Sequence, residues 1–172
     1  MVVLKEKNFV LRPFKKGDEI SLTKNANNKK IWINLLDKFP YPYTLKDAKK
    51  WIKDCNKNEN KKTRFAITID NKVVGGITFR VLDLNSKKTA EMGYWLGENY
   101  WGKGIMSEAV KLVLDYVFNN FDIIRMQAYV FEYNPGSCKV LEKNGFILEG
   151  RLRKNIFKDG KIVDEFLYAK IK

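Results

Sequence analysis

Three observations predict a single mixed α/β domain. The chain has 172 residues, within the usual size of one domain, and 45% of them are hydrophobic, enough for a substantial core. The spacing of apolar residues changes along the chain, from strand to helices, to antiparallel strands, and then to strand, helix, strand, helix and strand. No repeat, low-complexity tract or linker interrupts this order, so we expect one domain over residues 1–172.

The N-terminal part is expected to contain one strand and two helical segments. Residues Asn8–Phe14 alternate between apolar and polar side chains, which predicts a strand. Residues Glu19–Leu36 are helix-like but polar. After the proline-containing loop Lys38–Thr44, Thr44 and Asp47 have the spacing of a capping box, which predicts the start of a second helix.

A β-hairpin is expected in the middle of the chain. Residues Arg64–Asp70 and Lys72–Leu82 are strand-like, and Asp70-Asn71 between them is typical of a tight turn. Residues Thr89–Gly97 predict a third strand. From Ser107 to Phe121 the apolar residues recur at helical spacing, which predicts an amphipathic helix.

The C-terminal part is expected to contain a strand, a short helix and a second hairpin. Residues Ile123–Phe131 predict the strand. The helix has complete boundary signals, with Asn134 as N-cap, Pro135 at the first helical position and Gly145 just past the end. The tail predicts two strands that turn at Asp159-Gly160.

The net charge is +13 and the sequence pI is about 9.6, a balance that favours anionic partners such as a nucleotide, nucleic acid or an acidic protein. The lysines are spread along the whole chain, so a generally lysine-rich surface is the simpler explanation. No apolar run is long enough to span a membrane. Two distant cysteines, Cys55 and Cys138, predict no disulfide framework and favour a cytoplasmic protein.

The chain contains no histidine. This excludes Ser-His-Asp and Cys-His nucleophile systems, together with every histidine-based metal site. Any chemistry must therefore use carboxylates, Ser, Tyr, Cys, Lys or the backbone.

The segment ENYWGKGIMSEAV, from Glu98 to Val110, places Gly102 and Gly104 directly before a helix. The free N–H groups and the dipole of a helix N-terminus favour a phosphate, and glycines let it approach the backbone. The GxxxxGK[ST] pattern of a P-loop is absent, and Ser107 stands where the dinucleotide fingerprint GxGxxG requires glycine. On this segment alone, a plain turn into a helix explains the glycines as well as a phosphate site does.

Three segments, EMGYWLGENYWGKGIMSEAV, NPGSCKVLEKNGF and LEGRLRKNIFKDGKIVDEFLYA, together resemble the GNAT acetyltransferase superfamily. Within it they are most similar to the ribosomal-protein N-terminal (alanine) acetyltransferases. The resemblance runs from about Asn8 to the C-terminus and is strongest after Glu91. It implies a central, mostly antiparallel twisted sheet with a splayed central strand pair and helices on both faces. It also implies an acetyl-CoA-dependent N-acetyltransferase without a metal.

The resemblance implies that the loop Asn99–Ile105 binds the pyrophosphate of acetyl-CoA and that the strand before it pairs with the pantetheine arm. This chain has Asn99 where Gln or Arg is usual. Taken singly, each aromatic residue of this region is better explained as a core residue. The cofactor-binding residues implied are Tyr94, Trp95, Leu96, Asn99, Tyr100, Trp101, Gly102, Lys103, Gly104, Ile105, Asn134 and Ser137.

Glu91 is our first candidate for the general base, with an exposed strand-end glutamate as the equal alternative. Ser137, on the first turn of its helix, matches a serine of the ribosomal branch and could donate to the leaving thiolate. Many superfamily members place a tyrosine at the position of Leu141, so their tyrosine mechanism cannot be carried over to this chain. Glu149 and Asp164 are expected to be structural or to contact the substrate.

Two further positions bear on the chemistry. A glutamate proposed as the base in some ribosomal-protein acetyltransferases falls near Ile156, so this chain departs from their pattern. Cys138 lies in the apolar pattern of a helix with no histidine to activate it, and we expect a core residue.

The sequence therefore predicts an enzyme that transfers acetyl from acetyl-CoA to a primary amine by direct attack in a ternary complex. The acceptor is a protein N-terminus or a small-molecule amine. The alternative is a basic RNA- or ribosome-binding module with a vestigial acetyl-CoA pocket, which steeply salt-dependent binding to nucleic acid would reveal. The aromatic residues and late strands also permit a homodimer.

Overall fold

A computed structural model describes residues 2–57 and 62–172 of the chain. These residues form two compact units. Unit 1 comprises Met1–Thr78 and Tyr94–Ile105, and unit 2 comprises Phe79–Gly93 and Met106–Lys172. Two strands contribute residues to both units, and the units are described in turn.

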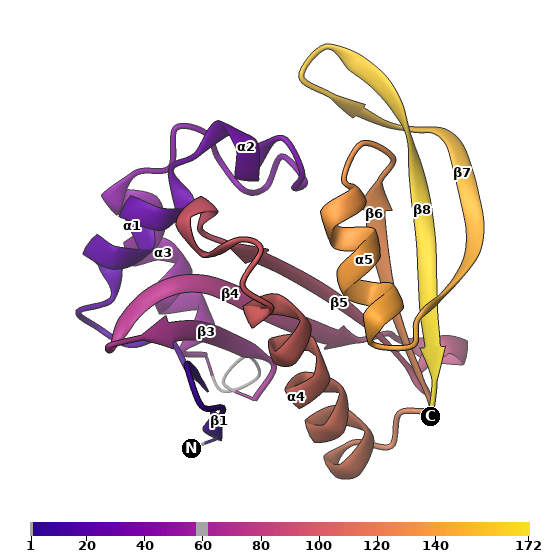
Figure 1. The fold of residues 1–172 in the computed structure, drawn as a ribbon, viewed down its shortest axis with the longest axis horizontal. Coiled ribbons are helices and arrows are strands. Elements are labelled where there is room, and N and C mark those ends of the chain that lie inside the picture. The colour runs from indigo at the N-terminus through magenta and orange to yellow at the C-terminus, as the bar shows by residue number, and fades with distance from the viewer. Residues whose placement is uncertain (1, 58–61) are drawn as a thin grey trace. The chain divides into compact units, whose positions relative to one another are not determined.

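Unit 1 contains most of the N-terminal elements (Figure 1). Its strands and helices are β1 (Leu4–Lys5), β2 (Val10–Arg12), β3 (Arg64–Ile69), most of β4 (Lys72–Val81), the end of β5 (Thr89–Leu96), α1 (Glu19–Ala26), α2 (Lys29–Trp32), α3 (Leu45–Cys55) and the 3-10 turn η2 (Glu98–Tyr100).

The hairpin between β3 and β4 is confirmed. Asp70 and Asn71 have φ angles of 48° and 61°, as a two-residue hairpin turn requires. The helical segment expected from Glu19 to Leu36 is divided in two: α1 ends at Ala26, and the side chain of Asn28 accepts the N–H of Lys30 to cap α2. The strand β1 was not expected.

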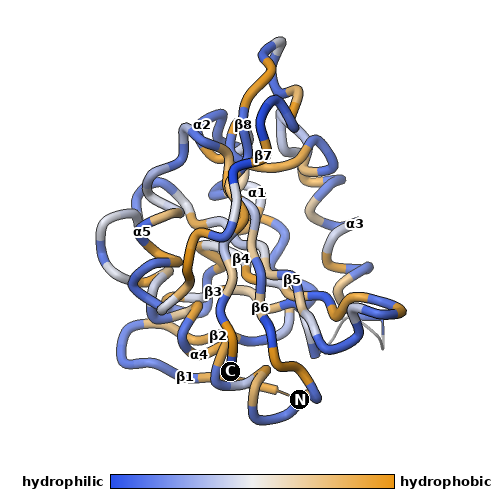
Figure 2. The backbone as a smooth tube through the Cα atoms, turned by 90° about the vertical axis from the view of Figure 1, so that its right-hand side faces the viewer, coloured by the Kyte–Doolittle hydropathy of each residue, from blue (hydrophilic) through white to orange (hydrophobic). Residues whose placement is uncertain are grey.

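The capping box before α3 is also confirmed. The side chain of Thr44 accepts the backbone N–H of Asp47, and the carboxylate of Asp47 accepts the backbone N–H of Thr44 at 2.9 Å. Hydrophobic and hydrophilic residues alternate along the turns of α3 (Figure 2), and its apolar face is buried in the core of unit 1. The buried core residues are Phe14, Leu22, Ala26, Tyr43, Ala48, Ile52, Cys55, Ala66 and Val73.

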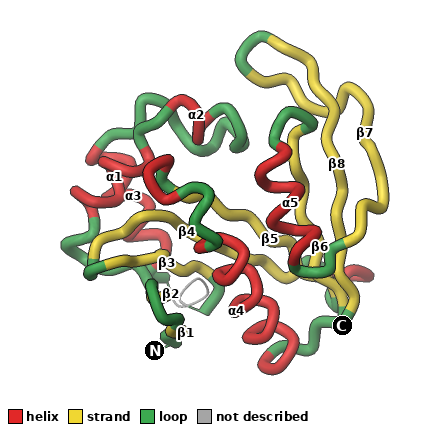
Figure 3. The backbone as a smooth tube through the Cα atoms, viewed as in Figure 1, coloured by secondary structure: helices red, strands yellow, loops and turns green. Residues whose placement is uncertain are grey.

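Unit 2 contains the C-terminal elements. They are the end of β4, the 3-10 turn η1 (Leu84–Ser86), the first part of β5, α4 (Ile105–Asn120), β6 (Arg125–Phe131), α5 (Pro135–Lys143), β7 (Ile147–Lys158) and β8 (Lys161–Ile171). The expected hairpin turn is confirmed, since Asp159 and Gly160 have φ angles of 48° and 77°. β7 and β8 run side by side beyond the end of β6 (Figure 3).

The eight strands are hydrogen-bonded in the order β1-β2-β3-β4-β5-β6-β8-β7, the mixed and mostly antiparallel sheet that was expected. β5 and β6 pair in parallel, through the three residue pairs from Thr89 with Arg125 to Glu91 with Gln127. β6 pairs with β8 over its whole length, from Arg125 with Ile171 to Phe131 with Glu165. No helix among residues 2–57 and 62–172 is long and apolar enough to cross a membrane.

Candidate active site

The glycine segment forms an exposed loop in unit 1 that leads directly into α4. Gly102 and Gly104 have φ angles of +73° and +76°, in the left-handed region where a side chain is strained. A Cβ placed on either glycine would meet no described atom within 4 Å. The backbone conformation therefore requires both glycines, and the loop is open to a ligand that approaches the backbone.

Contacts within unit 1 hold this loop. The indole N–H of Trp101 donates to the carbonyl of Leu96 at 2.7 Å, and its backbone N–H donates to the carbonyl of Glu98 at 3.1 Å. The ammonium of Lys103 lies 5.6 Å from the centre of the Tyr100 ring, within the range of a cation–π contact. The protein's own contacts thus set the loop conformation.

Glu98 connects the start of the loop to α2. Its carboxylate accepts the side-chain amide of Asn28 at 2.8 Å and forms an ion pair with Lys30. The bond to Lys30, followed by the bond to Asn28, lowers the pKa of Glu98. Glu98 is therefore ionised at neutral pH and orients the loop, while the next residue, Asn99, is exposed.

The end of β5 is packed in unit 1. A Cβ on Gly75 would lie 2.6 Å from the carbonyl oxygen of Trp95, and a Cβ on Gly76 would lie 2.9 Å from its indole nitrogen. The Trp95 ring also lies 5.9 Å from that of Phe39, and Leu96 is buried. This packing agrees with the core interpretation of Trp95, and its role toward acetyl-CoA stays a prediction, as does that of the half-buried Tyr94.

The start of α5, in unit 2, has the expected cap. The side-chain oxygen of Asn134 accepts the backbone N–H of Ser137 at 3.1 Å, and Pro135 occupies the first turn. Gly145, just past the end, has a φ of +77°. Ser137 is half-buried on the first turn, where the helix dipole favours a developing negative charge.

Replacing Asn134 with alanine should lower the free energy of unfolding by about 1 kcal/mol, because an N-cap oxygen is lost. Urea denaturation would measure the change. Asn134→Ser keeps a capping oxygen and should recover most of the loss. Equal destabilisation by the two substitutions would contradict a capping role.

Two predictions about α5 can be compared with its packing. Leu141, where many family members have tyrosine, is fully buried in the core. Cys138 is half-buried. It lies close enough to Tyr168 for the two side chains to interact, and the hydroxyl of Tyr168 donates to Glu142 at 2.9 Å. Burial, followed by these two neighbours, raises the pKa of Tyr168.

The carboxylates singled out in the sequence form ion pairs in unit 2. Glu91 lies 3.1 Å from Arg80 and remains partly exposed. Glu149 accepts two hydrogen bonds from Arg125, at 2.8 and 2.5 Å. The side-chain bond to Arg125 lowers the pKa of Glu149, which fits a structural role.

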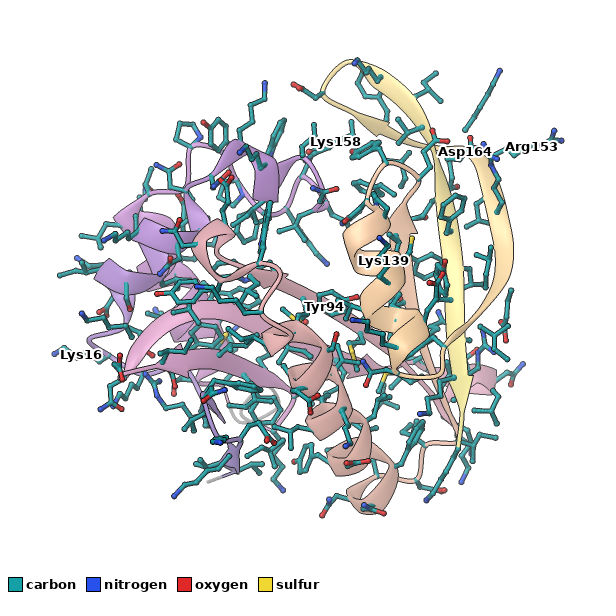
Figure 4. All side chains as sticks on the ribbon, in the orientation of Figure 1. Lys16, Tyr94, Lys139, Arg153, Lys158 and Asp164 are labelled. Carbon is teal, nitrogen blue, oxygen red and sulfur yellow. The ribbon has the colours of Figure 1, made fainter. Side chains whose placement is uncertain are left out.

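Asp164 holds an irregular stretch of β7. Its carboxylate accepts the backbone N–H of Lys154 at 2.7 Å and the Nε–H of Arg151 at 2.5 Å, and these bonds, in that order, lower its pKa. Lys154 has a left-handed φ of +55° in this stretch. In Figure 4, Asp164 lies on β8 beside β7, whereas Arg153 extends outward. These contacts fit a structural role for Asp164.

The sequence analysis missed Glu165, which is only 6% exposed. The sequence offers one indication of its burial, because Glu165 lies among the strand-like residues Val163, Phe166 and Leu167. A carboxylate in such a position is unusual, because burial disfavours its charged form.

Among residues 2–57 and 62–172, no group of three or more His, Cys, Asp and Glu side chains could hold a metal ion.

The chain matches the family model of the acetyltransferase (GNAT) domain over residues 8–147. It belongs to the GNAT acetyltransferase family. The acetyl donor of this GNAT N-acetyltransferase is acetyl-CoA. The matched residues include the glycine loop, Glu91 and the start of α5.

Individual relatives agree with this family. The chain is 33% identical over 174 residues to the probable N-acetyltransferase YjcK of Bacillus subtilis, covering 97% of this chain and 96% of that protein. It is 38% identical over 108 residues to the ribosomal-protein-serine acetyltransferase of Escherichia coli, covering 62% of this chain and 59% of that protein.

A solved structure is also similar over nearly the whole chain. It is that of the microcin C7 self-immunity acetyltransferase MccE, in complex with acetyl-CoA and AMP. The TM-score is 0.84 and the identity 26%, covering 97% of this chain and 94% of that one. The GNAT fold expected from the sequence is thereby confirmed.

Proposed function

We propose that this GNAT enzyme acetylates a primary amine by direct attack on acetyl-CoA in a ternary complex, without a covalent acetyl-enzyme intermediate. Residues 1–172 would act as a single N-acetyltransferase domain, and the family match over residues 8–147 includes parts of both units. The main support for assigning acetyl-CoA to particular residues is the loop before α4, in which Gly102 and Gly104 have left-handed φ angles.

This loop is suited to the pyrophosphate of acetyl-CoA. N–H groups at a helix N-terminus and the helix dipole favour an anion, and the two glycines leave the backbone uncovered. Lys103 adds a positive charge. We assign the pyrophosphate to Asn99–Ile105 and the pantetheine arm to the backbone of Tyr94, Trp95 and Leu96, with Asn134 as a further contact.

Ser137 would protonate the leaving thiolate. Its half-buried position on the first turn of α5 places the hydroxyl near the positive end of the helix dipole. A hydroxyl there can donate a hydrogen bond to the sulfur as the C–S bond breaks. Leu141 offers no hydroxyl for this step, so Ser137 is the assigned donor in α5.

Protein N-termini suit this chemistry better than lysine side chains. With pKa values near 8 and 10.4, about one α-amine in ten is neutral at pH 7, against roughly one lysine amine in 2,500. An α-amine therefore needs only modest help from a base such as Glu91, acting directly or through water. One relative is named a ribosomal-protein-serine acetyltransferase, which makes N-terminal serine the first acceptor to try.

The test combines calorimetry and catalysis. Acetyl-CoA should bind the wild-type protein with micromolar affinity, and release of CoA thiol should follow when a peptide with a free N-terminal serine is added. The same peptide with its N-terminus acetylated is the matched control and should give no release. A panel that adds N-terminal alanine peptides and small amines would identify the preferred acceptor.

Two outcomes would contradict the proposal. The first is binding of acetyl-CoA without acetylation of any amine in the panel. The second is absence of acetyl-CoA binding together with tight, steeply salt-dependent binding to RNA, which would favour the nucleic-acid module instead.

A further inference from the structure

Glu165 lies on the same face of the sheet of unit 2 as the candidate base Glu91. The ladders place Glu91 opposite Gln127 and Phe131 opposite Glu165. Since alternate residues of a strand face the same side, Gln127, Tyr129 and Phe131 share one face of β6. The bond from the Gln127 amide to the Tyr129 hydroxyl, at 3.4 Å, agrees with this.

In the part of the chain that the structure describes, the carboxylate of Glu165 has a polar partner but no ion-pair partner. The side-chain amide of Asn155, in β7, donates to it at 2.8 Å. Across residues 2–57 and 62–172, no lysine or arginine forms an ion pair with Glu165. A nearly buried carboxylate without a countercharge is costly in its ionised form, so it favours the arrival of a proton or a cation.

The other carboxylates of this region already form ion pairs. Asp164 and Glu132 both bind Arg151, and Glu91 pairs with Arg80. Burial raises the pKa of Glu165, the bond from Asn155 opposes the shift, and the negative charge of Glu91 adds to it.

The backbone of Glu165 lies opposite the end of β6 that leads to α5. Its side chain is on the face of the sheet away from α5, since Tyr168 and Lys170, on the other face, contact Glu142 and Asn144. Glu165 pairs with Phe131, the last residue of β6, and the chain reaches the N-cap Asn134 three residues later. The N–H of Glu132 donates to the carbonyl of Asp164 at 3.0 Å and holds this connection against β8. Glu91 lies opposite Gln127, which comes four residues before Phe131 along β6.

We infer that Glu165 is the general base that deprotonates the acceptor amine in the proposed acetyl transfer. The ammonium gives one proton to the Glu165 carboxylate and becomes a neutral amine. Its nitrogen attacks the thioester carbonyl carbon, the C–S bond breaks, and a second proton passes from nitrogen to sulfur by way of the Ser137 hydroxyl. The third hydrogen stays on the amide, and Glu165 returns its proton to solvent.

This inference rests on the proposed function and extends it. It assigns the base to β8, opposite the last residue of β6, and leaves Glu91 as a charge that raises the proton affinity of Glu165. Removing a base of this kind costs about 100-fold or more in rate.

The deciding experiment compares Glu165→Gln with Glu91→Gln, and uses Asp122→Asn as the matched control, since Asp122 is an exposed, ion-paired carboxylate of the same unit. Each is assayed with acetyl-CoA and a peptide with N-terminal serine. Glu165→Gln should lower kcat/KM about 100-fold and abolish the acidic limb of its pH profile. Asp122→Asn should match the wild type.

A second peptide, with an aminooxy group in place of the α-amine, separates a base from a structural residue. The aminooxy nitrogen is already neutral at neutral pH and needs no base. The defect of Glu165→Gln should therefore nearly disappear with this peptide. An equal defect with both peptides would overturn the assignment.

Thermal unfolding shows whether loss of folding explains the defect. Because the pKa of Glu165 is raised in the folded state, its ionised form destabilises the fold above that pKa. Glu165→Gln removes this cost, so its Tm at pH 7 should equal or exceed that of the wild type. A clearly lower Tm would contradict the expected cost of the buried charge.

Two outcomes separate this inference from the proposed function. Full activity of Glu165→Gln beside a large loss in Glu91→Gln would overturn the inference alone and make Glu91 the base. A wild-type protein that binds acetyl-CoA but acetylates no amine would overturn the proposed function, and the inference with it.

Discussion

Replacing Gly104 with aspartate should weaken acetyl-CoA binding at least about 100-fold, equivalent to about 2.7 kcal/mol. Gly104 has a φ of +76° and open space around it, so the new carboxylate would stand beside the N–H groups assigned to the pyrophosphate. It would repel the pyrophosphate and compete for its donors. Isothermal titration of acetyl-CoA would measure the loss.

Two controls separate charge from backbone strain. Asparagine has nearly the same shape as aspartate and a similar tolerance for a left-handed φ, but it carries no charge. Gly104→Asn should therefore bind acetyl-CoA clearly better than Gly104→Asp. Gly160→Asp places the same residue at a φ of +77°, also in open space, at the hairpin turn of unit 2. It should bind acetyl-CoA as the wild type does. Equal loss in all three variants would mean that the loop does not bind the pyrophosphate.

Replacing Asp18 with alanine should lower the free energy of unfolding by about 3 to 5 kcal/mol, the usual cost of breaking a buried ion pair. Asp18 is 3% exposed and accepts both terminal N–H groups of Arg12 at 2.8 Å. It also accepts the backbone N–H of Lys15 at 2.9 Å, just before α1. The substitution leaves the mostly buried guanidinium of Arg12 without its countercharge.

Asp122→Ala is the matched control for this measurement. Asp122 also forms an ion pair, with Lys88, but its side chain is 84% exposed. Exposed ion pairs are screened by solvent and contribute little to stability, so its urea transition should hardly move. If Asp18→Ala and Asp122→Ala shift the transition equally, the Arg12–Asp18 pair is not an anchor of unit 1.

Features that depend on a few adjacent residues were predicted well. The turns at Asp70-Asn71 and Asp159-Gly160 and the cap at Asn134 appear where expected, because turn and cap geometry depend on local backbone preferences and short side-chain bonds. The division between α1 and α2 was missed. Its cap, Asn28, looked like one more polar residue in an asparagine-rich helix.

The resemblance in the sequence was sufficient to predict the GNAT family, and with it acetyl-CoA as donor. It also placed the candidate glycine loop and the start of α5, since both are continuous motifs. The roles of individual carboxylates could not be predicted in this way. Glu91, Glu149 and Asp164 look alike in the sequence, and their ion-pair partners come from other strands.

The sequence by itself determined the family, the order of the elements and the local signals that begin and end them, because these depend on residues close together in the chain. Only the tertiary structure showed that Glu165 is buried with no ion-pair partner among the described residues. The environment of Glu165 is made by Phe131 in β6 and Asn155 in β7, which the sheet brings beside β8. Burial and charge balance depend on such distant neighbours, so the proton affinity of this side chain is a property of the fold.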